Sequence, residues 1–229
     1  MRKNLTEIVF ILDRSGSMNG LEKDTIGGYN SLLEKQRKAN GEVMISTILF
    51  DDCIEVLHNR VPLDEIKDIT EEEYYVRGCT ALLDAIGLTI QNIKKQQECM
   101  TQEERPGKTL FIITTDGMEN SSHRYTYSAI KELIDCQKEG FGWEFLFLGA
   151  NMDAIAEAGR FGIEADRAVS YKCDAKGTEV NFSVLSQAIS KVRQCETVCM
   201  EAALFGWKEE IEEDYRSREQ RNKRRNANL

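Results

Sequence analysis

Proline, histidine and long apolar runs are all scarce in this chain. Its 229 residues include 2 prolines, 2 histidines and 16 glycines, whereas 41% of the residues are hydrophobic and 30% are charged. This composition excludes collagen-like and disordered chains and is typical of a compact globular protein. No apolar run approaches the roughly 20 residues that cross a bilayer, and residues 8–12 are too short a run for a signal peptide because Asp13 interrupts them. We therefore expect a cytoplasmic protein without a membrane segment.

Two further features that mark particular functions are missing: paired cysteines and a net positive charge. The seven cysteines contain no C-x-x-C, so neither a zinc ribbon nor a thioredoxin-type site is supported. We expect such scattered cysteines to be small buried apolar residues. The formal net charge of −9 argues against nucleic-acid binding by the body of the protein, because phosphate contacts need a basic face.

Strand-like runs alternate with stretches of helical period along the chain. Short β-branched or aromatic runs predict buried strands, and apolar residues three or four apart predict helices. The predicted strands cover residues 7–12, 43–50, 53–57 with 60–62, 109–115, 143–148 and 168–171. The predicted helices cover residues 25–39, 82–99, 125–138 and 154–159, followed by one long helix from Phe182 to at least Trp207.

This alternation predicts an α/β fold with a doubly wound, mostly parallel central sheet and helices on both faces. The short spacing around Asp51 and Asp52 predicts a hairpin, and hence one antiparallel edge strand. We expect residues 1–207 to form one domain. Residues 208–229 carry an acidic block and then a basic block, which indicates a charged helical extension that frays into disorder, or a basic arm that reaches a partner or RNA.

The first predicted strand leads into a loop rich in oxygen donors. Asp13 is followed by Ser15, Gly16 and Ser17. Gly16 allows a sharp turn, and alternation along the chain puts both serines on the side of Asp13. Carboxylate and hydroxyl oxygens are hard donors, which suit Mg²⁺, Mn²⁺ or Ca²⁺ better than zinc.

Two more segments can present oxygens at the same edge of the sheet. Thr80 precedes the predicted helix that begins at residue 82, and Asp116 follows the predicted strand 109–115. In a doubly wound sheet, the carboxyl ends of the strands beside the reversal in strand order lie together and bind ligands. The sequence therefore predicts a divalent-cation site built from three loops.

These residues resemble the metal-ion-dependent adhesion site of von Willebrand factor type A (vWA) domains. The family has D-x-S-x-S in its first loop, a threonine in its second and an aspartate in its third. Those positions match Asp13, Ser15, Ser17, Thr80 and Asp116. The resemblance covers about residues 5–200 and implies the Rossmann-like vWA fold. The stand-alone form of the chain looks like the intracellular bacterial members of the family.

The resemblance implies metal-dependent protein binding without catalysis. Mg²⁺ usually keeps exchangeable waters, and in this family an aspartate or glutamate of a protein partner joins the metal. Mn²⁺ and Ca²⁺ are possible substitutes. A Mg²⁺-dependent phosphohydrolase is the alternative from another class, although aspartate-based enzymes need a second acid where Ser15 stands. A structural subunit with a merely stabilising metal is a third. We expect no nucleic-acid partner for the body and no membrane partner.

Other residues near the predicted site have weaker signals. A mixed apolar and polar rim suits a protein contact around a carboxylate, and its members are expected to be Met18, Asn19, Met118, Glu119, Asn120 and Tyr125. His58 is expected to be structural or exposed. His123, seven residues after Asp116, is expected to be an exposed loop residue, with a place at the border of the site as the alternative. Because sulfur is a poor Mg²⁺ ligand, Cys79 is expected to be a packing residue or a redox-sensitive neighbour of the metal.

Overall fold

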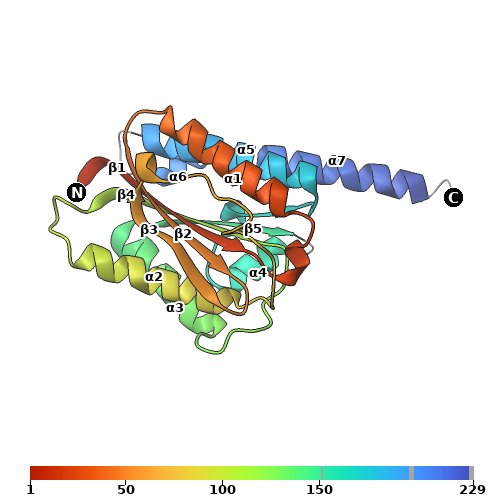
Figure 1. Cartoon of the computed structure of the whole chain (residues 1–229), viewed down its shortest axis with the longest axis horizontal. Coiled ribbons are helices and arrows are strands. Elements are labelled where there is room, and N and C mark those ends of the chain that lie inside the picture. The colour runs from red at the N-terminus through yellow and green to blue at the C-terminus, as the bar shows by residue number, and fades with distance from the viewer. Residues whose placement is uncertain (151, 196–198, 227–229) are drawn as a thin grey trace.

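Six strands form one sheet that helices cover on both faces (Figure 1). The structure is a computed structural model that describes residues 1–150, 152–195 and 199–226. The strands are β1 (Arg2–Asp13), β2 (Glu42–Phe50), β3 (Ile54–Pro62), β4 (Pro106–Thr115), β5 (Glu144–Ala150) and β6 (Ala168–Tyr171). The helices are α1 (Glu22–Arg37), α2 (Leu82–Glu98), α3 (Tyr127–Phe141), α4 (Ala154–Arg160), α5 (Ala175–Gln194), α6 (Met200–Ala203) and α7 (Glu209–Asn226).

The order of the strands explains where a ligand site can form. The sheet has the order β3-β2-β1-β4-β5-β6, and every neighbouring pair is parallel except β2 with β3. The chain therefore moves outward from β1 to β3 and then returns to the other side of β1 with β4. The reversal lies between β1 and β4, whose carboxyl ends are adjacent. The predicted fold class, including its antiparallel edge strand, is confirmed.

Both faces of the sheet are buried, which explains the continuous apolar runs of its strands. On β1, the side chains of Ile8, Phe10 and Leu12 pack in a core beneath α1, α5 and α7. Val9 and Ile11 point the other way, into a second core beneath α2, α3 and α4. Successive residues of a strand face opposite sides, so one short run supplies both cores.

The predicted helix from Phe182 is confirmed as far as Gln194, but its continuation to Trp207 is wrong. Helix α5 ends at Gln194, and the short helix α6 begins at Met200; residues 196–198 of the predicted helix lie outside the described residues. The ammonium of Lys108 donates hydrogen bonds to the carbonyl oxygens of Arg193 and Cys195, at 3.0 and 2.6 Å. These bonds satisfy carbonyls at the helix end, which otherwise lack partners.

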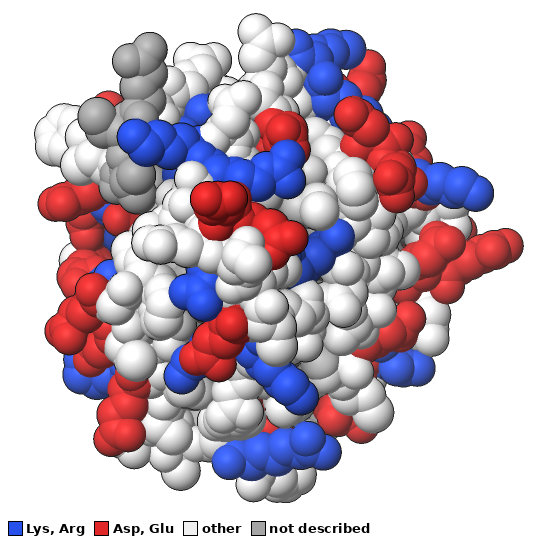
Figure 2. Space-filling view, turned by 90° about the vertical axis from the view of Figure 1, so that its left-hand side faces the viewer, with Lys and Arg blue, Asp and Glu red and all other residues white. Residues whose placement is uncertain are grey.

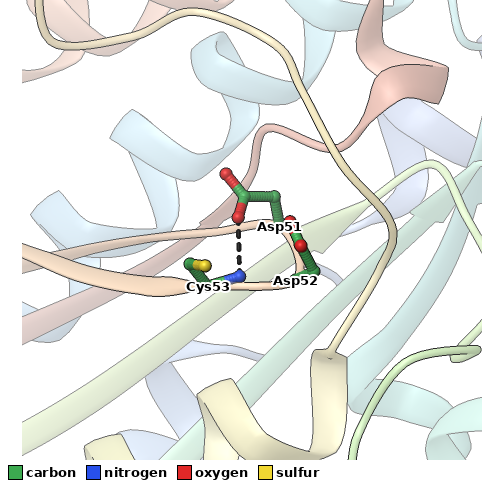
Figure 3. A group of neighbouring side chains, drawn as sticks. All are labelled: Asp51, Asp52 and Cys53. Atoms are coloured by element: carbon green, nitrogen blue, oxygen red, sulfur yellow. Dashed lines mark hydrogen bonds between the residues drawn. The ribbon is translucent and has the colours of Figure 1, made fainter.

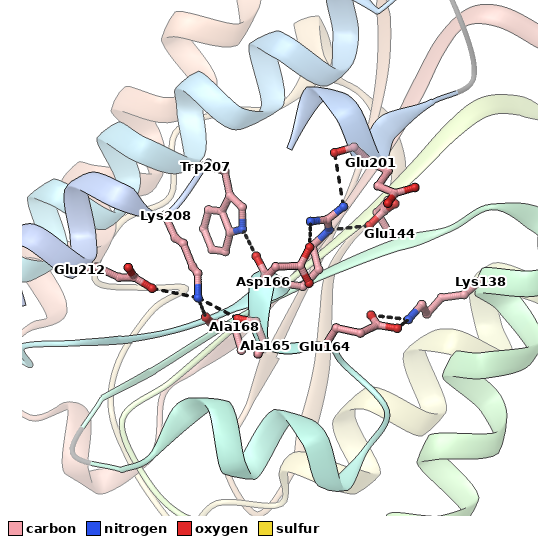
Figure 4. A network of polar contacts seen from close by, with 11 residues as sticks. Lys138, Glu144, Glu164, Ala165, Asp166, Ala168, Glu201, Trp207, Lys208 and Glu212 are labelled. Carbon is pink, nitrogen blue, oxygen red and sulfur yellow. Dashed lines mark hydrogen bonds and ion pairs between the residues drawn. The ribbon is translucent and has the colours of Figure 1, made fainter. Parts of the chain in front are cut away.

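Helix α7 occupies most of the predicted tail, and residues 227–229 lie outside the described residues. Its start is held against the segment that precedes β6 (Figure 4). The Trp207 indole donates to the carbonyl of Asp166 at 2.8 Å, and the side chain of Ile211 is buried. Within the described ranges, none of the helices combines the length and the apolar character that crossing a bilayer requires.

The expectation that the cysteines are buried is wrong. Cys173 and Cys195 are half-buried, and the other five cysteines are exposed. They lie on loops, at helix ends and on outward faces of helices, whereas the two cores are filled by larger aliphatic and aromatic side chains.

Candidate metal centre

Three loops meet at the carboxyl edge of the sheet, beside the reversal between β1 and β4. Asp13 ends β1, Asp116 follows β4, and Thr80 lies two residues before α2. The amide of Gly16 donates to the carbonyl of Gly78 at 3.2 Å, which joins the first loop to the second. The second loop is joined to the third in the same way, because the amide of residue 120 donates to the carbonyl of Thr80 at 3.1 Å.

Three hydroxyl groups converge on the backbone next to Asp116. The Ser17 hydroxyl donates to Asp116 Oδ1 at 2.5 Å, and Ser15 Oγ lies 3.0 Å from Ser17 Oγ. A Cβ atom placed on Gly117 would lie 2.9 Å from Thr80 Oγ1, 3.3 Å from Ser17 Oγ and 3.9 Å from Ser15 Oγ. Gly117 thus leaves open a small space that these oxygens border.

Asp13 is a buried carboxylate held by uncharged donors. The residue is only 1% exposed. Its Oδ1 accepts a hydrogen bond from the Ser15 amide at 2.7 Å, and its Oδ2 accepts one from the Thr115 hydroxyl at 2.6 Å. Burial raises the pKa of Asp13 to about 6, and the charge of Asp116 adds to the effect. The Tyr74 hydroxyl donates to the Asp13 carbonyl at 2.6 Å, which fixes the end of β1.

The chemistry of this donor set fits a divalent cation that prefers oxygen. The structure brings all five predicted site residues to one place, where they offer two carboxylates and three hydroxyls. Oxygen donors of this kind suit Mg²⁺, Mn²⁺ or Ca²⁺. Coordination of an ion by these five residues stays a prediction.

The loop after β4 also caps helix α2, which sequence reasoning missed. The α2 N-cap residue, Ala81, has no side-chain cap of its own. Glu119 Oε2 accepts the Leu83 amide at 2.9 Å, and Ser122 Oγ accepts the Asp84 amide at 3.0 Å. Free amides at a helix start need such acceptors. The alanine at this N-cap position is the signal in the sequence that another segment supplies the acceptors for the free amides of α2.

Asp84, in the first turn of α2, accepts hydrogen bonds from the same loop. Its Oδ2 accepts the amide of His123 at 2.9 Å, and its Oδ1 accepts the amides of Arg124 and Tyr125 at 2.9 and 3.0 Å. The loop after β4 and the start of α2 are therefore bound to each other in both directions. This fixes Thr80 relative to Asp116.

Asp51, directly after β2, joins the first two loops from the other side. Its Oδ2 accepts the Arg14 guanidinium at 2.9 Å and the Arg77 guanidinium at 2.7 Å. Both guanidinium carbons lie 5.3 Å from the ring centre of Tyr75. Burial acts to raise the pKa of Asp51, but the hydrogen bonds from Arg77 and Cys53 and the charge of Arg14 lower it overall.

A second acidic group, Asp51 with Asp52 and Cys53, has ligand atoms within 4.8 Å of one another (Figure 3). Asp51 Oδ1 already accepts the Cys53 amide at 2.6 Å, and Oδ2 accepts the two arginines. A carboxylate neutralised by two guanidinium groups has little capacity left for a cation. We assign this group to the positioning of the loops.

The expected rim is only partly at the surface. Met118 is 62% exposed, whereas Met18, in the helical turn that follows Ser15, is buried. Asn120 Oδ1 accepts the Thr80 amide at 2.9 Å, so this side chain supports the second loop. Asn19 is exposed and Tyr125 half-buried, and Glu119 is occupied by the α2 cap.

Among the histidines and cysteines near the site, one residue was missed. His123 is exposed and His58 is half-buried, as expected. Cys79 is exposed, so the packing role expected for it is wrong. Cys173, in the segment after β6, places its Sγ 3.5 Å from Asp116 Oδ2. No sequence pattern marks this contact, because the two residues are joined only by the fold.

No protein-family model matches the sequence, and no curated protein matches it. Solved structures resemble it in three dimensions. The vWF domain of the type V pili tip protein Mfa5 from Porphyromonas gingivalis has a TM-score of 0.58 at 11% identity, over 83% of this chain and 96% of that one. A von Willebrand factor type A structure from Catenulispora acidiphila has a TM-score of 0.53 at 14% identity, over 81% and 42%. This chain has the vWA fold.

Proximal thread matrix protein 1 from the mussel byssus shares the fold. A structure of that protein with a zinc-occupied MIDAS motif (metal-ion-dependent adhesion site) has a TM-score of 0.56 and 13% identity to this chain, over 83% of this chain. The match spans 47% of the mussel protein, less than half of its length. At such identities, the three likenesses establish the fold alone.

Proposed function

We propose that this chain is a divalent-cation-dependent protein-binding module. The residues that would hold the cation are Asp13, Ser15, Ser17, Thr80 and Asp116. Mg²⁺ is the preferred ion, with Mn²⁺ and Ca²⁺ as substitutes. When bound, the cation supplies a coordination position that a carboxylate of a partner protein fills.

One observation carries the proposal: three hydroxyl oxygens and the carboxylate of Asp116 converge around Gly117. Hydroxyl groups add no negative charge to a metal site. Both oxygens of Asp13 already accept hydrogen bonds, from Ser15 and Thr115. A cation among these donors therefore retains an affinity for a further carboxylate, which a partner's aspartate or glutamate can satisfy.

The test compares two buried threonines by calorimetric titration of the full chain with Mg²⁺ and Mn²⁺. Thr80→Ala removes a hydroxyl from the proposed site. Thr89→Ala is the matched control, because Thr89 is equally buried but donates to the Ala85 carbonyl within α2. We expect Thr80→Ala to lose roughly tenfold or more in affinity, which corresponds to one ligand, and Thr89→Ala to bind as the unmodified chain does. Equal affinities for all three proteins would refute the site.

We further propose that the protein binds without turnover and acts in the cytoplasm. Five exposed cysteine thiols suit a reducing compartment better than an oxidising one. The fold is shared with a domain from a pilus tip protein and with a protein whose MIDAS motif holds zinc, and this supports a metal-bound role. Metal-dependent hydrolysis of simple phosphoesters by the purified chain would instead favour the phosphohydrolase alternative.

A further inference from the structure

Helix α7 has two halves with opposite charge and different surroundings. The first half is acidic, its Ile211 side chain is buried, and the preceding Trp207 and Lys208 anchor it to the body (Figure 4). The ammonium of Lys208 donates to the carbonyls of Ala165 and Ala168 at 2.7 and 2.9 Å. All of these contacts lie before or at the start of β6, so α7 begins at the amino edge of the sheet.

The middle of α7 reaches the carboxyl edge, where the proposed metal centre lies. Arg218 forms an ion pair with Asp174, and the Lys172 ammonium lies 3.4 Å from Glu219 Oε1. Residues 172–174 directly follow β6, and Cys173 between them contacts Asp116. One short segment therefore touches both α7 and the proposed metal centre.

The remainder of α7 projects past this edge (Figure 1). At about 1.5 Å per residue, the helix extends roughly 10 Å beyond Glu219 before it ends at Asn226. Residues 216–226, here termed the basic arm, hold six basic residues and one acidic residue, so the rest of the chain carries a net charge of −14. The side chain of Arg216 is 69% exposed, and Arg221 is also exposed.

On the opposite side of the molecule, the residues that the structure describes show no comparable concentration of one charge. Figure 2 shows the side on which the chain begins, where acidic and basic side chains are interspersed. Helix α7 thus carries the basic residues of the arm past the edge that holds Asp13 and Asp116.

We infer that the basic arm is a second contact surface for the partner that binds the metal centre, and that this partner presents an acidic protein surface. The inference rests on the proposed function. A body with a charge of −14 repels an acidic partner at long range, and a basic arm beside the site offsets this repulsion where the partner's carboxylate enters. The arm thereby steers the partner toward the metal.

The composition of the arm excludes two other modes of docking. Residues 216–226 contain no apolar side chain. A helix that enters a protein groove needs apolar anchors, and a helix that lies on a membrane needs an apolar face. A long nucleic acid would pass along the acidic body as well as the arm, whereas a short acidic segment can reach the arm and the metal together.

The experiment measures the binding of a fluorescein-labelled oligoglutamate peptide to the full chain by anisotropy, with Mg²⁺ present. The arm variant carries three changes: Arg221→Gln, Arg224→Gln and Arg225→Gln. The matched control removes the same charge from elements that begin or end at the amino edge: Lys3→Gln, Lys38→Gln and Lys95→Gln. We expect the arm variant to bind roughly tenfold more weakly at low ionic strength, with a smaller loss at high salt, and the control to bind within about twofold of the unmodified chain.

The outcomes separate the arm from the metal centre. If chelation by EDTA abolishes binding but the arm variant and the control bind alike, the proposed role of the arm is wrong, and the proposed metal-bridged binding is supported. If the arm variant loses affinity and EDTA has no effect, the arm stands as an acidic-peptide contact and the proposed metal-bridged function is wrong. A single-stranded RNA of equal charge that binds the arm more tightly than the peptide overturns the assignment of an acidic protein partner.

Discussion

Strand β1 carries two buried carboxylates, Glu7 and Asp13, and their surroundings differ in kind. Both residues point to the same face of the strand, and neither is more than 1% exposed. Glu7 Oε1 lies 2.8 Å from the Arg60 guanidinium, and Glu7 Oε2 accepts the Gln97 amide at 2.7 Å. Asp13 instead accepts an amide and a hydroxyl, and the charge that acts on it is that of another acid, Asp116.

The difference indicates which carboxylate is structural and which is available for a ligand. Burial raises the pKa of both groups, because a charge in a medium of low polarity needs a compensating partner. For Glu7 the fold supplies that partner as Arg60. For Asp13 the contacts come from uncharged donors, and the proposed cation would supply the compensating charge. Burial of a carboxylate alone therefore does not indicate a metal site. The charge of the neighbouring groups indicates it.

Glu7→Gln is expected to have the largest effect on stability. It leaves the buried Arg60 guanidinium without its carboxylate, and breaking a buried ion pair from one side costs about 3–5 kcal/mol. Urea unfolding measures the loss. The affinity for Mg²⁺ should be unchanged, because Glu7 lies six residues before Asp13 on β1, about 20 Å away along the strand. A loss below about 1 kcal/mol would contradict the assignment of Glu7 as a structural charge.

Asp13→Asn should have the opposite effects: it should keep the stability of the metal-free protein and lose Mg²⁺ binding. Without metal, its stability should equal or exceed that of the unmodified chain, because the change removes one of two neighbouring acids. The unmodified chain should gain about 2.7 kcal/mol when Mg²⁺ is at about 100 times its dissociation constant, and the variant should gain nothing. Unfolding in EDTA and in Mg²⁺ measures both quantities. Glu7→Gln serves as the control that keeps the gain.

Gly117→Ala tests the space between the loops without changing any proposed ligand. The added methyl would lie 2.9 Å from Thr80 Oγ1 and 3.3 Å from Ser17 Oγ, so the donors must move apart. We expect roughly a tenfold loss of Mg²⁺ affinity, or about 1.4 kcal/mol, by calorimetric titration. Gly140→Ala is the control, because a Cβ there meets nothing within 4 Å. Equal affinities for the two variants would show that the donors do not border this space in the loaded protein.

Sequence patterns predicted the sheet and the residues of the candidate site, but they did not reveal the partners of buried charges. The apolar runs and the loop from Asp13 to Ser17 are local signals, so their reading needs no knowledge of the fold. In the sequence, Arg60 looks like an ordinary strand residue. In the structure it has a φ of 54°, lies where the pairing of β3 is irregular, and forms an ion pair with Glu7. The end of α5 depends on Lys108, which lies more than eighty residues earlier in the chain. Such contacts follow from the packing of distant segments, and spacing along the chain does not encode them.

The exposed counterpart of the Glu7–Arg60 pair is Asp174 with Arg218, and it should contribute least. The Asp174 side chain is 48% exposed, so water already solvates its charge. Arg218→Gln also removes the ion pair with Asp214, whose side chain is 13% exposed, so it is expected to cost about 1 kcal/mol, the upper end of the range for solvent-accessible ion pairs. Asp174 keeps its second role, because its Oδ1 accepts the Gly177 amide at 2.9 Å and caps α5. Urea unfolding of Arg218→Gln beside Glu7→Gln measures the contrast directly. If the two losses were equal, burial would not be what separates these arginine–carboxylate pairs, and the middle of α7 would be part of the stable body rather than the base of a projecting arm.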